Sequence, residues 1–180
     1  MIKSILSAPQ PVLSQPTQAI SAIDKKTRQI IADMKQTLTH ATNPKGVGLA
    51  AVQINIPLQI FVMRLNDSDP ITVYINPKIT SYSKEVTTKR ENGSHLEGCL
   101  SIPRIWGVVA RSVSVTLQYM DESGQSKQEV FKNFPARIVQ HEVDHLNGIL
   151  YTQRVLEQRG KLFHPVIDEK GKEALEEFTI

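Results

Sequence analysis

The sequence predicts an α+β fold. Candidate strands cluster in the middle of the chain with helical patterns before and after them, which is typical of α+β proteins rather than of an alternating parallel sheet. Residues 112–120 alternate strictly between apolar and polar side chains, as in a half-buried antiparallel strand. The length of 180 residues fits a single domain over 1–180, and 40% hydrophobic with 22% charged residues excludes wholesale disorder.

The N-terminal half is expected to contain an arm, a helix and two strands. Three prolines within the first 20 residues indicate an extended arm. A helix follows, with Ser21 as its N-cap and apolar residues at helical spacing from Ile23 to Leu38, and Asn43-Pro44 ends it. Strands are expected near 58–65 and over 71–76, the second ended by Pro77.

The C-terminal half is expected to contain a hairpin and two helical segments. A turn at 121–124 should lead residues 125–131 back as the partner of the alternating strand. A second helix is predicted from about Pro135, a favourable first-turn residue, to a C-cap at Asn147-Gly148. A short helical stretch is expected in the tail, from Glu169 to Phe178.

Composition narrows the classes of function. The formal charge of +3 is too small to indicate binding to nucleic acid or to a membrane surface. No apolar run approaches the roughly 20 residues of a membrane-spanning helix, and no signal peptide is apparent. The single cysteine, Cys99, excludes an internal disulfide and favours a reducing compartment. A cytoplasmic protein is therefore expected.

The strongest motif is His-Glu-Val-Asp-His at 141–145. Residues i and i+4 lie on one face of a helix, so His141 and His145 can bind one metal ion. Glu142, beside the first ligand, can take a proton from water at that ion. The alternative is a solvated helix face with two ordinary histidines, which the apolar neighbours Ile138 and Val143 disfavour.

A third ligand is needed, because catalytic metal sites usually have three protein ligands and an open position. Tyr151 stands where astacin-like peptidases have a third histidine, and Glu157 is poorly placed for a thermolysin-like site. Cys99 is the candidate, since thiolates bind iron, zinc and cobalt strongly. Taken alone, a lone cysteine is more often a small buried apolar residue.

Three blocks in order identify a family. The chain resembles the peptide deformylases in its blocks Gly46–Gln53 (G-x-G-L-A-A-x-Q), Glu97–Ser101 (E-G-C-L-S) and Gln140–His145 (Q-H-E-x-D-H), and the resemblance covers roughly residues 5–155. It implies antiparallel sheets packed around a central helix that carries H-E-x-x-H, with an N-terminal helix and a short C-terminal helical tail. It also implies a hydrolase that removes the formyl group from N-formylmethionyl peptides.

The same resemblance implies the roles of site residues. Cys99, His141 and His145 bind one divalent metal ion, Fe(II) in the cell, although the ligands also admit Zn, Ni or Co. Glu142 is the general acid and base, and Gln53 with the Leu100 N–H stabilises the oxyanion, which agrees with the needs of formamide hydrolysis. The substrate-binding residues are Gly46, Val47, Gly48, Glu97, Phe134 and Ile138, together with the stem of Arg137; any of the apolar ones could equally be plain core.

Supporting residues are hypotheses. Metal-bound imidazoles usually donate their other N–H to a carboxylate or carbonyl, and Glu97 and Asp144 are the candidates. Arg111 either pairs with one of these carboxylates or is a surface charge at a strand edge. His95 is expected to be exposed, whereas Arg104 or Trp106 could shape the rim of the peptide site.

The expected partners are N-formylmethionyl nascent peptides, with the ribosome near its exit tunnel as a further candidate. No long basic C-terminal helix of the kind that docks some family members on the ribosome is evident. Three other functions compete: a zinc peptidase indifferent to Cys99, a non-catalytic binding module, and a basic nucleic-acid binder. Intact Glu142, Gln53 and Cys99 argue against the second, and the small charge argues against the third.

Overall fold

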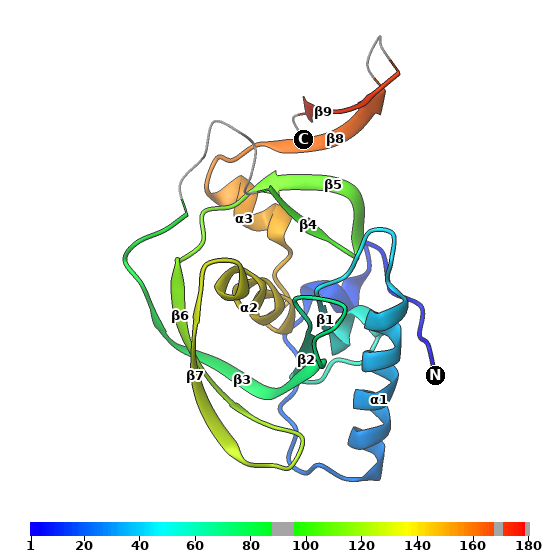
Figure 1. Ribbon diagram of the computed structural model, residues 1–180, viewed down its shortest axis with the longest axis vertical. Coiled ribbons are helices and arrows are strands. Elements are labelled where there is room, and N and C mark those ends of the chain that lie inside the picture. Colours follow the sequence, from blue (N-terminus) through cyan, green and yellow to red (C-terminus); the bar gives the residue numbers. More distant parts are fainter. Residues whose placement is uncertain (88–95, 168–170, 179–180) are drawn as a thin grey trace.

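In the described part of the chain, two antiparallel sheets and three α-helices form the fold (Figure 1). The computed structural model describes residues 1–87, 96–167 and 171–178. The first sheet has the order β1-β2-β3-β6-β7 and the second β4-β5-β8-β9. The strands are β1 (Gly48–Ala50), β2 (Ile60–Met63), β3 (Thr72–Tyr82), β4 (Leu96–Cys99), β5 (Ile102–Val108), β6 (Ser114–Met120), β7 (Ser126–Lys132), β8 (Leu162–Ile167) and β9 (Glu173–Phe178). The helices are α1 (Lys25–His40), α2 (Asn133–Leu146) and α3 (Tyr151–Glu157), with 3₁₀ turns η1 (Pro11–Ser14) and η2 (Ala51–Ile54). The predicted α+β class is confirmed.

The five-stranded sheet is covered by a helix on each face. Ile60 and Val62 of β2 pack in one apolar cluster with α1, whereas Phe61 and Met63 pack in another with α2. All four residues of β2 are therefore buried, which explains why this segment reads as a continuous apolar run. The predicted alternation in β6 is confirmed, because Val115 and Leu117 join the α2 cluster and pair with β7 in a regular hairpin.

The helix boundaries differ in part from the prediction. Asp24, not Ser21, caps α1, because its carboxylate accepts a hydrogen bond from the Thr27 N–H at 2.8 Å. The helix ends at His40, before Asn43-Pro44. The predicted C-terminus of α2 is confirmed: Asn147 is the C-cap, and Gly148 follows in the left-handed region at φ 73°.

Strand β3 does not end at Pro77 as predicted but continues to Tyr82. The register against β6 shifts between Ile75 and Lys78, so Pro77 lies in a bulge where its missing N–H interrupts no regular ladder. Asn76 takes a positive φ of 48° there, and its side chain bonds both the N–H and the carbonyl of Ile20 at 2.8 Å.

The predicted helix in the tail is wrong. Residues 173–178 form β9, which pairs with β8 in the register Leu162↔Phe178 through Ile167↔Glu173. The Glu and Leu residues of this segment favour a helix only weakly, and the pairing with β8 overrides this intrinsic helix propensity. The helical segment of this region is instead α3, and Tyr151 and Val155 of α3 pack with Leu162 beneath the second sheet.

No helix among the described residues is long and apolar enough to cross a membrane.

Candidate metal centre

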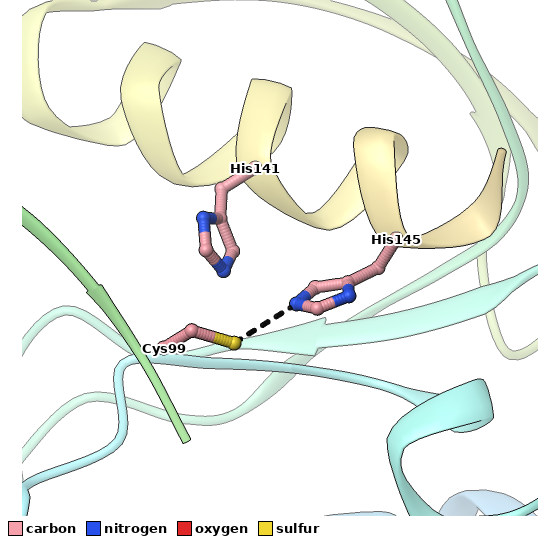
Figure 2. Close-up of side chains that lie close together, drawn as sticks. All are labelled: Cys99, His141 and His145. Atoms are coloured by element: carbon pink, nitrogen blue, oxygen red, sulfur yellow. Dashed lines mark hydrogen bonds between the residues drawn. The ribbon is translucent and has the colours of Figure 1, made fainter. Parts of the chain in front are cut away.

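Three buried side chains from two elements converge beside α2. Cys99 is the last residue of β4, and His141 and His145 lie one turn apart on α2, with their rings 4.8 Å apart (Figure 2). The Cys99 Sγ lies 3.2 Å from the His145 Nε2, and one ligand atom from each of the three lies within 4.8 Å of the others. The three predicted ligands therefore form one cluster that can hold a metal ion.

A chain of charged side chains holds His141 in place. The Glu97 Oε1 lies 2.7 Å from the His141 Nδ1, which leaves the ring's Nε2 for a metal. Arg111 donates to both oxygens of Glu97, at 2.7 and 3.1 Å, and to Asp144. Arg111 is only 5% exposed, so its interpretation as a surface charge is wrong.

Asp144 is bound by two arginines rather than by an imidazole. Besides Arg111, it accepts two hydrogen bonds from Arg154 of α3, at 2.7 and 3.1 Å. Arg154 in turn pairs with Glu157 on the same helix. Of the two carboxylates proposed as imidazole partners, Glu97 contacts an imidazole. Asp144 instead links Arg154 of α3 to Arg111 beside the cluster.

The electrostatics favour a thiolate at Cys99. Burial alone would raise the pKa of the thiol, but the imidazoles of His145 and His141 hold that pKa well below its ordinary value. Only a thiolate is a strong metal ligand, so this shift suits coordination. A thiolate with two imidazoles is a donor set that fits iron, zinc or cobalt.

Glu142 lies beside the cluster with an unusual pKa. It is 3% exposed, and burial raises the pKa of its carboxyl to about 7. Its Oε2 has no hydrogen-bond partner among the described residues, and the same is true of the Nδ1 of His145. An unpartnered buried carboxylate oxygen is costly unless a ligand or water reaches it, so the atom marks a site rather than a core.

Gln53 is oriented by the backbone. Its Oε1 accepts from the Ala50 N–H at 2.8 Å, so its Nε2 faces the Ser101 Oγ at 3.1 Å and the Cys99 Sγ at 3.6 Å. The amide N–H groups of Gln53 are therefore donors aimed at the cluster. Sequence reasoning assigned no role to Ser101, which is fully buried and contacts both neighbours.

A cavity of about 340 Å³ opens onto Cys99, His141 and Glu142. Every residue predicted to bind substrate lines it, as do Gln53 and Leu100; the predicted set is Gly46, Val47, Gly48, Glu97, Phe134, Arg137 and Ile138. Arg104 and Trp106 also line it, whereas His95 lies outside the described residues. The structure thus brings the predicted residues of all three sequence blocks around one cavity.

Two supporting residues escaped sequence reasoning. Gln140 of α2 bonds both the N–H and the carbonyl of Ser112, at 3.1 and 2.9 Å, although its place before His141 in the third block was visible. Arg154 carries no sequence pattern that ties it to Asp144, since the two lie on different helices.

Comparison with known proteins agrees with this geometry. A family model described as polypeptide deformylase matches residues 2–161. The peptide deformylase of Pseudothermotoga lettingae is 40% identical over 159 residues, which cover 88% of this chain and 86% of that protein. The peptide deformylase of Synechococcus elongatus, solved in complex with actinonin, matches with a TM-score of 0.75 and 38% identity over 84% of this chain and 78% of that one. The Met-Ala-Ser-bound class I type b peptide deformylase of Acinetobacter baumannii matches with a TM-score of 0.74 and 33% identity over 86% and 98%.

Proposed function

This chain belongs to the polypeptide deformylase family, and from that premise we propose which of its residues carry out the reaction. The protein is a hydrolase that removes the N-formyl group from the formylmethionine of new polypeptides and releases formate. The observation that supports the assignment most directly is the buried cluster of Cys99, His141 and His145, of which Cys99 and His141 line a cavity together with Glu142.

Cys99, His141 and His145 would hold one divalent metal ion. The fit rests on the low pKa of the Cys99 thiol and on the contact of Glu97 with the His141 Nδ1. When bound, such an ion supplies a Lewis acid that makes water a nucleophile near neutral pH. We expect Fe(II) in the cell, while zinc, nickel and cobalt also suit this donor set.

Glu142 serves as general base and then as general acid. It accepts the proton of the attacking water and passes it to the departing amine, a role worth about 10²- to 10⁴-fold in rate. A carboxyl group with a pKa of about 7 can both take up and release a proton near neutral pH.

Gln53 and the Leu100 N–H stabilise the negative charge that develops on the formyl oxygen. The hydrogen bond from Ala50 fixes the Gln53 amide before substrate arrives, so no reorganisation is needed during the reaction. Removing one donor of this kind costs about 2.7–4 kcal/mol in the transition state.

The peptide would bind between two sheet edges. β1 is the edge strand of one sheet and β4 that of the other, and Gly48 of β1 and Gly98 of β4 both line the cavity. Edge strands present free main-chain groups that an extended peptide can pair with. Val47 and Ile138 would surround the methionine side chain. We propose further that the substrate is a nascent chain in the cytoplasm, which this protein binds near the ribosomal exit tunnel.

The decisive experiment is incubation of the metal-loaded protein with formyl-Met-Ala-Ser and assay of formate. Wild-type protein should release formate, and Glu142→Ala should lose about 10²- to 10⁴-fold in kcat while keeping its metal. Glu129→Ala, at an exposed position on β7, is the control. Cys99→Ala should lose metal and activity together, whereas a peptidase indifferent to Cys99 would keep both. Absence of formate from metal-loaded wild type would refute the assignment.

A further inference from the structure

The β8–β9 hairpin adds two strands to the wall of the substrate cavity. It begins at Leu162, just beyond the family match at 2–161, and extends outward from β5 (Figure 1). One row of paired residues crosses the whole sheet: Gly98 pairs with Trp106, Trp106 with Phe163, and Phe163 with Glu177. Gly98 and Trp106 line the cavity, so the row leads from the cavity onto the hairpin.

The same face of the hairpin carries exposed apolar side chains, with Glu173 and Glu177 beside them. Side chains two residues apart on a strand share a face, so Pro165, Ile167 and Leu175 lie on the face of Phe163. Ile167 is 71% exposed and Leu175 46% exposed. The opposite face carries Leu162, which packs against α3. We call Trp106, Phe163, Pro165, Leu175 and Ile167 the hairpin strip.

We propose that the hairpin strip binds apolar residues of the substrate downstream of the formylmethionine; this inference rests on the proposed function. The strip is continuous with the cavity through Trp106, so a chain leaving the cavity can lie on it. Strands lie about 4.8 Å apart, which places β9 about 14 Å from β4, and an extended peptide spans that distance in about four to five residues.

The charges of β9 disfavour other occupants. Glu173 shares the face of the strip and would repel the phosphates of RNA, and Glu177 on the same face already pairs with Lys161. Pairing of β9 with a second copy would bring the acidic residues Glu173, Glu176 and Glu177 of one copy close to the same acidic set of the other. An apolar or basic peptide meets neither obstacle.

The test uses three substrates: formyl-Met-Ala-Ser, formyl-Met-Ala-Ser-Gly-Ser-Leu-Val-Leu-Lys, and the same nonapeptide with serine at positions 6–8. Wild type should process the apolar nonapeptide with a kcat/KM about 3- to 10-fold above that of the serine nonapeptide, through a lower KM. In the double variant Ile167→Ser/Leu175→Ser this ratio should fall to about 1, with the tripeptide rate unchanged. Val130→Ser, an exposed apolar position on β7, should keep the wild-type ratio.

The outcomes separate the two proposals. Failure of wild type to release formate from the tripeptide would overturn the proposed function itself. Normal tripeptide activity without a preference for the apolar nonapeptide, or a preference that survives in the double variant, would overturn the role of the strip alone. Sedimentation that shows a wild-type dimer lost in the double variant would assign the strip to self-association and also overturn the proposal.

Discussion

At the scale of single residues, two buried glutamates close to the same cluster have opposite properties. Burial alone would raise the pKa of Glu97, but its contacts with His141 and Arg111 hold that pKa at about 2. Burial raises the pKa of Glu142 to about 7, and no described residue donates a hydrogen bond to its Oε2. Environments that separate two carboxyl pKa values divide their roles: in the proposed mechanism Glu97 stays charged and orients His141, and Glu142 exchanges protons.

The low pKa of Glu97 predicts a loss of stability in acid. Because the folded-state pKa lies below the ordinary 4.5, the ionised carboxylate stabilises the fold fully above pH 4.5, and this contribution is lost as the pH falls toward about 2. In metal-free protein, urea unfolding of wild type should therefore weaken across this window more steeply than that of Glu97→Gln. Glu173→Gln, at an exposed site, should follow wild type. Equal slopes for wild type and Glu97→Gln would contradict the assigned pKa.

Gly48 is predicted to set the position of Glu142. A Cβ added at Gly48 would lie 2.3 Å from the Glu142 Oε1 and 2.8 Å from its Cδ, so the carboxylate must move. Gly48→Ala should lower kcat by about 10- to 100-fold, as expected for a displaced catalytic group, with metal content unchanged. Gly171→Ala strains the backbone at a φ of 73°, but its added Cβ would meet no atom within 4 Å beyond its chain neighbours, so kcat should stay at the wild-type value. Wild-type kcat in Gly48→Ala would show that Glu142 has room to adjust.

At the scale of elements, α2, the helix that carries the His-Glu-Val-Asp-His motif, is held in place both by packing and by hydrogen bonds. α2 places His141 and His145 on one face and its apolar residues Val139 and Leu146 in the core against the first sheet. Gln140 joins the helix to the segment before β6 through both peptide groups of Ser112. The histidines are therefore held by packing and hydrogen bonding on two sides.

Gln140→Leu should destabilise the protein by about 1–3 kcal/mol. The apolar side chain is similar in size but leaves the N–H and carbonyl of Ser112 without these partners. Urea unfolding would measure the change in the free energy of unfolding. Gln128→Leu, exposed on β7, should stay within about 0.5 kcal/mol of wild type. A similarly small change in Gln140→Leu would mean that water replaces the lost bonds.

Helices and strands could be predicted from the sequence where the local pattern of apolar, polar and capping residues determines them. The alternation in β6, the spacing in α1 and the Asn147-Gly148 end of α2 are all local patterns, and the structure confirms them. The prediction of a helix at 173–178 is wrong because the pairing of β9 with β8 depends on a neighbouring strand that the local pattern does not specify. In the site, the three family blocks located the cluster, whereas the contact of Arg154 with Asp144 joins two helices and has no local pattern.

At the scale of the whole molecule, the cluster joins the two sheets. Cys99 belongs to β4 of the four-stranded sheet, and both histidines belong to α2, which packs on the five-stranded sheet. A metal ion bound there would link the two sheets. It would bind the folded state in preference to the unfolded chain, because folding brings the three ligands together.

Metal removal should therefore lower Tm. An ion at 100 times its Kd adds about 2.7 kcal/mol to the free energy of unfolding, so chelation should shift Tm down by several degrees and readdition of Zn(II) or Co(II) should restore it. Differential scanning calorimetry would measure the shift. Cys99→Ala serves as the control, because its Tm should respond little to the chelator. A wild-type Tm that ignores chelation and metal alike would argue against binding at this cluster.

Because Cys99 is the single cysteine, its reactivity can be used to measure how much of the protein carries metal. A thiol-specific reagent has one target in the entire chain, and that residue is 8% exposed beside the two histidines. If bound metal protects the thiolate, the rate of labelling would be proportional to the fraction of molecules without metal, and no mutation or substrate is needed. If Cys99 holds the metal as proposed, oxidation of this one sulfur would abolish activity, and no second thiol in the sequence could form a disulfide with it.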